Sequence, residues 1–317
     1  MDELRHACAA VAARARSVTV VTDAIPAYAA ALCDVPESGP EAPQVPSAAA
    51  EEREARAAYW LTMDAINFGS GWFPTLRKRD GLSGYNTIAA ALQDRFDRHG
   101  GWTAAELTRL DAATVGAALG QDPDHELMAL YAASLRDLGE HVSAQNGGRF
   151  AAVADAAGGS AVALARRLGM WPSFADTSRY DELTIPFLKR AQIAAADLNR
   201  AGVVRFPDLH ELTMFADNLV PHVLRLDGIL RFDPELVARI DRKELIGHGS
   251  PEEVEIRACA LHAVELLVAA TPGPRPHAAA PPDHTLTAAS LDQLLWQRGQ
   301  QPHYKASPRH RSRCTAY

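Results

Sequence analysis

Apolar residues recur at three- and four-residue intervals along most of the chain, which is the spacing of an amphipathic helix. The pattern is clearest over residues 253–269 (EVEIRACALHAVELLVA), where one stripe is apolar throughout. That stripe consists of Val254, Ala258, Leu261, Val264 and Leu267. Because such a stripe is buried against neighbouring elements, we predict a long helix here that lies against the core.

Two segments upstream, 208–215 (DLHELTMF) and 219–230 (LVPHVLRLDGIL), also alternate apolar and polar residues at helical spacing. Pro221 suits the start of the second helix, where its missing N–H has no partner to lose. We therefore predict that residues 205–269 form a close series of helices. A further helix is expected around 291–296 (LDQLLW).

Evidence for strands is thin. Only residues 17–22 (SVTVVT) form a run of β-branched residues, and one short run cannot make a sheet. The sequence has no repeat at solenoid periods and lacks the glycine motifs of Rossmann and P-loop proteins. These patterns predict an all-α fold, with residues 1–317 forming a single domain.

Two segments, 34–50 and 271–283, are rich in Pro and Ala and poor in packing residues, which predicts loosely ordered surface loops or linkers. The chain ends in a basic segment, 308–317 (PRHRSRCTAY). Basic tails usually fray, but this one closes with Cys, Ala and Tyr, which is unlike a solubilising appendage. We expect the tail to be docked.

The composition, 47% hydrophobic and 22% charged over 317 residues, is that of a globular protein with a large core. No stretch approaches the roughly 20 apolar residues that span a bilayer, and the N-terminus lacks the pattern of a signal peptide, so we predict a cytoplasmic protein that does not bind membranes. The four cysteines are scattered without a CxxC pair, which favours free buried thiols. The sequence has no HExxH motif or Cys/His cluster, and we expect neither a metal nor a cofactor.

The formal net charge of -7 argues against a surface that holds a long polyanion. A small substrate with one phosphate needs only a local basic pocket. We therefore expect a small-molecule substrate, no stable nucleic-acid complex, and a monomer.

Residues 59–74 (YWLTMDAINFGSGWFP) contain the first group of candidate site residues. Asp64, Asn67 and Phe68 fall within one helical turn and could share a face. A heterocyclic base would stack on the ring and bind the polar pair along its edge. Alternatively, Asn67 and Gly69 form a helix C-cap and the aromatic residues fill the core.

Residues 186–192 (PFLKRAQ) contribute Lys189 and Arg190, which are either the solvated face of an exposed helix or part of a basic pocket. Asp217 lies in 213–222 (TMFADNLVPH). It is either a plain helix N-cap or a carboxylate directed into a cleft from the end of a rigid element.

The last candidates lie in 252–259 (EEVEIRAC) and 310–314 (HRSRC). Arg311 and Arg313 flank a serine, and guanidinium groups match phosphate oxygens well. A disordered basic tail is the alternative.

Together these segments resemble the queuosine salvage proteins, also called queuosine 5'-phosphate N-glycosylases. The shared motifs, in the family's order, are DAINF, SGY at 83–85, KRAQ, LTMFAD, VPHVL, EVEIRAC and HRSRC. The resemblance is dense over 59–92 and 186–269, returns at 291–317, and is weak over 1–50 and 93–180.

The resemblance implies an all-helical fold similar to the helix-hairpin-helix DNA glycosylases. It also implies hydrolysis of queuosine 5'-phosphate at its N-glycosidic bond, which releases queuine and ribose 5-phosphate. Asp217 is then the catalytic carboxylate, and Lys189 belongs to the same catalytic pocket. The residues expected to bind substrate are Asp64, Asn67, Phe68, Tyr85, Arg190, Phe215, Arg257, Arg311 and Arg313. After Phe68 the chain departs from the animal members, which leaves the base-stacking residue, and any role of Trp72, open.

Such a cleavage builds positive charge on the ribose and negative charge on the base. We expect Asp217 to face the sugar, where it stabilises this charge, acts as general base or, less favourably, forms an adduct. Queuine has carbon in place of N7, so Asp64 and Asn67 are expected to assist its departure through the base edge, with Phe68 or Phe215 holding the ring. Candidates for the phosphate are Lys189, Arg190, Arg311 and Arg313.

Two other functions are compatible with the same residues. A non-catalytic protein would hold a modified base or nucleotide in the same pocket without cutting it. A glycosylase acting on modified DNA or tRNA fits the implied fold, although the acidic net charge argues against it.

Overall fold

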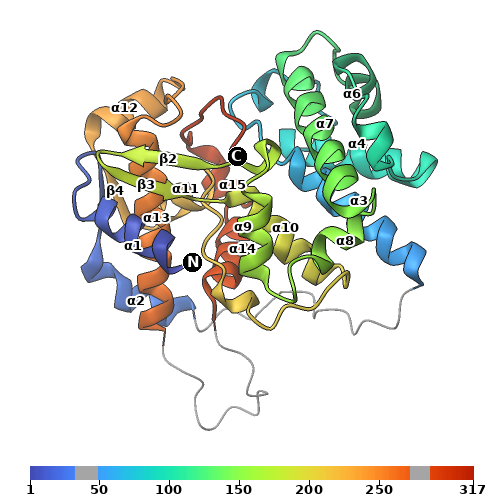
Figure 1. Cartoon of the computed structure of the whole chain (residues 1–317). Helices are drawn as coiled ribbons and strands as arrows, with labels where there is room; N and C mark the ends of the chain where they lie inside the picture. The colour runs from blue at the N-terminus through green and yellow to red at the C-terminus, as the bar shows by residue number, and fades with distance from the viewer. Residues whose placement is uncertain (33–48, 272–285) are drawn as a thin grey trace. The chain divides into compact units, whose positions relative to one another are not determined.

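The computed structural model describes residues 1–32, 49–271 and 286–317 (Figure 1). The loops predicted at 34–50 and 271–283 lie, except for their end residues, outside the described residues. The described chain is mostly helical but contains two short sheets, so the predicted all-α fold is borne out only in part. Its contacts define two compact units, and each is described by itself. The single domain, like the similarity to helix-hairpin-helix glycosylases, stays a prediction.

The first unit comprises the described residues 1–32, 177–187, 210–271 and 286–312. Its centre is α13 (Pro251–Ala270), which confirms the long helix predicted over 253–269. The Ser250 hydroxyl accepts a hydrogen bond from the Glu253 amide and so caps the helix start, and Pro251 follows in the first turn. Helices α1 (Asp2–Ala12) and α2 (Ile25–Leu32) pack against α13, where Figure 1 shows them in blue beside the orange helix.

Two short antiparallel sheets also belong to the first unit. Strand β1 (Val18–Val20) lies in the predicted β-branched run and pairs with β4 (Leu230–Phe232). Strands β2 (Thr177–Tyr180) and β3 (Leu183–Pro186) form a hairpin. The expectation that the first run has no partner is wrong, because its partner strand is distant in sequence.

The helical series predicted over 205–269 is only partly correct. Helix α11 (Val220–Leu226) begins near Pro221 as expected, but the chain turns at Gly228, with a φ of 79°, and enters β4. Over 208–215 only a 3-10 turn forms, η4 (Leu209–Glu211). Backbone groups here find partners elsewhere: within the first unit the Glu211 carbonyl accepts from Arg5 and the Phe215 amide donates to Asp292.

Four more elements complete the first unit. They are η1 (Thr22–Ala24), α12 (Pro234–Asp241), α14 (Ala288–Arg298) and α15 (Pro302–Ala306). Helix α14 contains the run predicted at 291–296, and it packs on α11 and α13.

The second unit comprises the described residues 49–176, 188–209 and 313–317. Its elements are α3 (Ala50–Ala65), η2 (Phe73–Thr75), α4 (Gly84–His99), α5 (Ala104–Leu107), α6 (Ala112–Leu119), α7 (Glu126–Asn146), α8 (Phe150–Asp155), α9 (Ala161–Leu168), η3 (Pro172–Phe174) and α10 (Lys189–Arg200). Helix α10 packs against α3 and α9, while α5 and α6 pack on α7. The adjoining ends of α3 and α10 contain most of the candidate residues of this unit.

The C-terminal segment is docked, as expected. In the first unit, the Arg311 carbonyl accepts from the Ile246 amide at 2.9 Å, and the His310 carbonyl accepts from the Asn218 side chain at 3.1 Å. In the second unit, the Tyr317 carbonyl accepts from the Gly69 amide at 3.1 Å. The tail is therefore part of the fold.

None of the helices in the part of the chain that the structure describes combines the length and apolar character needed to cross a membrane.

Candidate functional site

In the second unit, Lys189 and Asn67 join the end of α3 to the start of α10. The Lys189 ammonium donates to the Asn67 carbonyl oxygen at 3.0 Å and to its side-chain Oδ1 at 3.3 Å. Lys189 is buried and Asn67 half-buried. Helix α3 ends at Ala65, so the prediction that Asn67 and Phe68 share a helical face with Asp64 is wrong.

Asp64 lies in the last turn of α3 and is fully buried, with 0% of its surface exposed. Neither carboxyl oxygen accepts a hydrogen bond of good geometry from any residue that the structure describes. Burial, and then the charge of Asp197, raise the pKa of Asp64 well above its usual range. The charges of Lys189 and Arg200 and the nearby Asn67 amide act in the opposite direction.

Asp197 is a site residue that the sequence analysis missed. It lies on α10, two turns after Lys189, and its Oδ1 accepts from the Arg200 guanidinium at 2.7 Å. Burial raises the pKa of Asp197 to about 6, although the charges of Arg200 and Lys189 oppose the change. Asp197 is a single acid on a helix, and nothing in the sequence marked it as a site residue.

Tyr85, on α4, belongs to the same electrostatic group. Burial, and then the negative charges of Asp64 and Asp197, raise the pKa of the Tyr85 hydroxyl. The pKa of Tyr59, on α3, is raised for the same reasons. The structure therefore brings together four of the predicted site residues, Asp64, Asn67, Tyr85 and Lys189, in the second unit.

Arg190 forms a hydrogen bond with the backbone at the C-terminal end of α3. Its Nη1 donates to the Ala65 carbonyl at 2.6 Å, and its guanidinium lies 4.9 Å from the ring centre of Phe68 and 5.6 Å from that of Phe174. Burial lowers the pKa of Arg190 to about 10. The interpretation of Lys189 and Arg190 as a solvated helical face is wrong, because both side chains are buried.

Phe68 fills the core of the second unit, as in the alternative interpretation of this segment. It is buried beneath Arg190 and contacts the Tyr131 ring edge-on at a centroid distance of 5.0 Å. Trp72 is also buried, and its indole N–H donates to Glu126 at 2.7 Å. Arg313 forms an ion pair with the same Glu126 oxygen at 3.3 Å and remains exposed.

The start of α10 is held in a strained conformation. Leu188, immediately before Lys189, has a φ of 53°, which non-glycine residues rarely adopt. The Asp176 carbonyl accepts from the Leu188 amide, and its carboxylate accepts from the Lys189 amide at 3.0 Å. Asp176 therefore fixes the direction in which α10 begins.

In the first unit, Asp217 precedes α11 and is half-buried. Its Oδ1 accepts from the amides of Leu219 at 2.8 Å and Val220 at 3.1 Å. The capping interaction is therefore present. Its Oδ2 accepts no hydrogen bond from the described residues, so capping and a catalytic role are compatible.

Two arginines of the tail accompany Asp217. Burial lowers the pKa of Arg309, the charge of Asp217 opposes this effect, and Arg311 reinforces it. Both arginines are half-buried. Arg309 directly precedes the HRSRC motif and was missed because the motif does not include it.

Arg257 and Phe215 flank the backbone on which Asp217 lies. Arg257 is fully buried, and its Nε donates to the Ala216 carbonyl at 3.0 Å while the guanidinium lies 3.9 Å from the Phe187 ring centre. Phe215 is also buried. These contacts support a positioning role for Arg257; its predicted contact with substrate remains a prediction.

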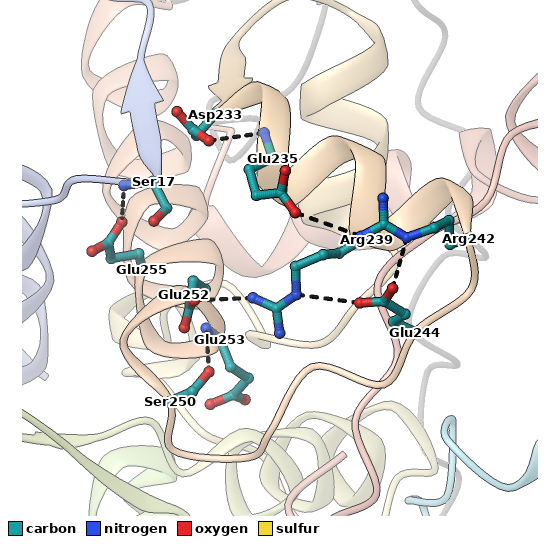
Figure 2. Close-up of polar contacts among 10 residues, drawn as sticks. All are labelled: Ser17, Asp233, Glu235, Arg239, Arg242, Glu244, Ser250, Glu252, Glu253 and Glu255. Atoms are coloured by element: carbon teal, nitrogen blue, oxygen red, sulfur yellow. Dashed lines mark hydrogen bonds and ion pairs between the residues drawn. The ribbon is translucent and has the colours of Figure 1, made fainter.

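The acidic residues of the EVEIRAC motif serve the fold. One Glu255 oxygen accepts from the amides of Arg16, Ser17 and Val18, at 3.1, 2.6 and 3.1 Å, and the other accepts from the Tyr180 hydroxyl at 2.8 Å. Figure 2 shows the bond to Ser17.

Glu253, two residues earlier, is also buried. Burial acts to raise its pKa, but His248, Arg257 and the Gly249 amide outweigh this effect and lower it to about 2. Glu253 is therefore held as an ionised carboxylate at the start of α13, and Glu255 bonds the same helix to residues 16–18.

Two cavities described within the units lie away from these residues. One of about 580 Å³ in the second unit is bordered by Trp102 and Phe150, and one of about 510 Å³ in the first by Arg225 and Phe232. Neither is lined by a predicted site residue. Within the described ranges, no three His, Cys, Asp or Glu side chains are grouped so as to hold a metal ion. Cys8, Cys259 and Cys314 are free and buried, whereas Cys33 lies outside the described residues.

The candidate residues thus form a carboxylate, amide, lysine and tyrosine group in one unit and a carboxylate with two arginines in the other. Such groups suit a small polar ligand that carries an anionic group. A family model described as "Queuosine salvage protein" matches residues 47–317, and the chain belongs to that family. The resemblance of the motifs is thereby confirmed.

Named relatives agree with this assignment. A queuosine 5'-phosphate N-glycosylase/hydrolase of Sphaerobacter thermophilus is 40% identical over 277 residues, which cover 84% of this chain and 82% of that protein. A mouse protein of the same name is 32% identical over 190 residues, 58% of this chain and 56% of the relative. The cattle protein is 33% identical over 153 residues, 46% of this chain and 45% of the relative.

Proposed function

We propose that this protein hydrolyses the N-glycosidic bond of queuosine 5'-phosphate and releases queuine and ribose 5-phosphate for queuine salvage. The observation that carries the proposal is the Sphaerobacter thermophilus relative, which bears this activity in its name and is 40% identical over 84% of the chain. The protein is then a hydrolase that uses water as its second substrate.

In the first unit, Asp217 is the catalytic carboxylate. Two backbone amides hold its Oδ1, so Oδ2 is the oxygen available to the ribose or to the attacking water. As the bond breaks, positive charge develops on the sugar, and a fixed carboxylate stabilises it without reorganisation. The same oxygen can accept a proton from water.

In the second unit, Asp64, Asn67, Tyr85 and Lys189 receive the base. Queuine is a 7-deazaguanine, so its departure cannot be assisted by protonation of N7. Hydrogen-bond donors along the base edge must stabilise the developing negative charge, and Lys189 supplies an ammonium donor that lies 3.3 Å from the Asn67 side-chain oxygen. Phe68 supports this group from the core of the same unit.

The 5'-phosphate is assigned to the tail arginines. The stronger candidate is Arg311 of the first unit, because it lies near Arg309, on which the charge of Asp217 acts. Guanidinium groups bind phosphate in a fixed geometry, and binding energy away from the scissile bond positions the reacting atoms. Arg190 is buried against two aromatic rings, which supports a structural role for it.

The test is to incubate the purified protein with queuosine 5'-phosphate and to follow queuine by liquid chromatography with mass detection. Guanosine monophosphate and queuosine serve as comparison substrates. We expect queuine from the nucleotide and a far slower reaction of the nucleoside, which lacks the phosphate. Equal kcat/KM for the two would remove the phosphate-binding role. An intact substrate that raises the melting temperature would instead identify a binding protein.

A further inference from the structure

Asp64 is a buried carboxylate whose partner is missing. It is fully buried, and neither oxygen accepts a hydrogen bond of good geometry from the residues that the structure describes, although the nearby Asn67 amide acts to lower its pKa. Leaving such a group unpaired is strongly unfavourable, and native structures rarely do so without a functional reason. The nearby cations have other partners: Lys189 donates to Asn67, and Arg200 donates to Asp197. A ligand is therefore the natural source of the missing donors.

A second carboxylate, that of Asp197, belongs to the same electrostatic group as Asp64. The charge of Asp197 disfavours ionisation of Asp64, and burial raises the pKa of both carboxyl groups. Two neighbouring buried carboxyl groups of this kind bind a shared proton more readily than free carboxylates do. A cation that brings its own N–H donors can take the place of this proton. The exchange leaves the net charge of the group unchanged, so Lys189 and Arg200 do not oppose it.

The side chains that surround the two carboxylates are themselves partly exposed to solvent. The charged groups that act on Asp64 are Lys189, Asp197 and Arg200 from α10, and Asp64 in turn raises the pKa values of Tyr59 from α3 and Tyr85 from α4. Tyr59, Tyr85, Asp197 and Asn67 are half-buried. The two phenol rings add aromatic surface, which favours cations.

We propose that Asp64 and Asp197 bind the secondary ammonium group in the side chain of queuine and so select this base over guanine. The inference rests on the proposed function. Queuine carries an aminomethyl arm on its 7-deazaguanine ring; the amine is protonated at neutral pH and offers two N–H donors. Guanine has no such arm. The ring edge of the base is neutral, so one ionised carboxylate is enough to bind its N–H donors. A cationic ammonium group has two N–H donors and a positive charge, which suit a pair of carboxylates. Asn67 and Lys189 then remain to bind the ring edge.

The pair acts as a specificity determinant with a defined proton balance. When the ammonium binds, the shared proton leaves for the solvent and two N–H···O bonds form. Affinity for queuine should therefore fall as the pH is lowered from 7 to 5, because the pair takes up protons. The binding of 7-deazaguanine, which lacks the arm, should show no such loss.

Calorimetric titration of the full chain with queuine and with 7-deazaguanine tests this. Titrations at pH 7 in two buffers of different ionisation enthalpy measure the protons released. We expect release with queuine alone. In Asp64→Asn the release should disappear and queuine affinity should fall on the order of 30-fold or more, because a buried charge pair is lost. Asp94→Asn, an exposed carboxylate of α4 paired with Arg79, is the matched control and should bind queuine as the wild type does.

Equal proton release with both bases would overturn the proposal and assign the pair to the ring edge. So would unchanged queuine affinity in an Asp64→Asn protein that melts at or above the wild-type temperature. Hydrolysis of queuosine 5'-phosphate by the wild type distinguishes this failure from failure of the proposed function. If the substrate is cut but queuine binding releases no proton, only the role of the carboxylate pair is lost.

Discussion

Glu255 in the first unit and Asp64 in the second are both carboxylates with almost no exposed surface, 1% and 0%. Glu255 accepts hydrogen bonds from three consecutive amides and a tyrosine hydroxyl, whereas Asp64 accepts none from the described residues. Burial therefore does not separate a structural acid from a binding acid. What separates them is whether the fold itself supplies the donors.

The largest effect is expected for Glu255→Ala. The change leaves three amides and the Tyr180 hydroxyl without their acceptor, so the free energy of unfolding should fall by about 3–5 kcal/mol. Urea denaturation measures it. Glu252→Ala is the control, because Glu252 lies on the same helix and forms a half-exposed ion pair with Arg239 (Figure 2). It should cost no more than about 1 kcal/mol. Equal losses would show that hydrogen bonding does not distinguish the two acids.

Asp217 combines both behaviours, since one of its oxygens is bonded by the fold and the other is not. Asp217→Asn keeps an oxygen for the Leu219 and Val220 amides but removes the charge, so turnover should fall on the order of 100-fold or more with little loss of stability. Initial rates of queuine release measure it. Asp233→Asn, which alters the carboxylate that caps α12, is the control and should retain full activity. Near-normal turnover in Asp217→Asn would exclude its catalytic role.

Asp64→Asn should stabilise the folded protein. The pKa of Asp64 is higher in the folded protein than in the unfolded chain, so ionisation of this carboxyl destabilises the fold. The folded protein is therefore not penalised below the unfolded pKa, and it loses stability as the pH rises through the folded pKa. The variant should therefore gain about 1–2 kcal/mol over the wild type at pH 7.5 and much less at pH 4.5. Thermal denaturation at the two pH values is the measurement. Destabilisation at both would mean that Asp64 has a partner in the fold.

The smallest effect is expected for Arg313→Ala. Arg313 is exposed and its ion pair with Glu126 is solvated, so stability should change by less than about 1 kcal/mol. Arg190→Ala, which removes a buried guanidinium from the end of α3, should cost about 3 kcal/mol or more. Melting temperatures of the two variants compare them directly. A similar loss in both would show that the exposed tail arginine is as important to the fold as the buried one.

The helices were the most predictable part of the fold, because α13 and α14 each place their apolar residues at regular intervals. Strand β4 was not predictable in this way. Its three residues, Leu230, Arg231 and Phe232, directly follow a segment with helical spacing, and only Gly228 marks the turn before them. The segment 208–215 resembles a helix in its spacing, but its backbone bonds to residues far away in the sequence.

The candidate site was predictable where its residues lie in motifs. Asp64, Asn67, Tyr85 and Lys189 were all named from the sequence, and the structure places them in one electrostatic group. Their burial was not predictable, since two adjacent basic residues such as Lys189 and Arg190 are typical of a solvated face.

Two further residues gave no signal of their own. Asp197 is a single acid on a helix, and Arg309 stands outside its motif. Their importance follows only from the charges that packing brings near them.

The hydrogen bonds of Glu255 also determine when, during synthesis, the N-terminal segment can form its native contacts. They join residues 16–18 to a side chain 237 to 239 positions later, and α1 packs on the same late helix. Ribosomes add roughly 5–20 residues per second, so the first residues to emerge wait on the order of 10 to 50 seconds for α13 to be made. The contiguous stretch 49–176 of the second unit can meanwhile begin to fold. We expect a nascent chain that stops before residue 251 to expose the apolar face of α1, which makes this helix the part of the protein most in need of a chaperone during synthesis.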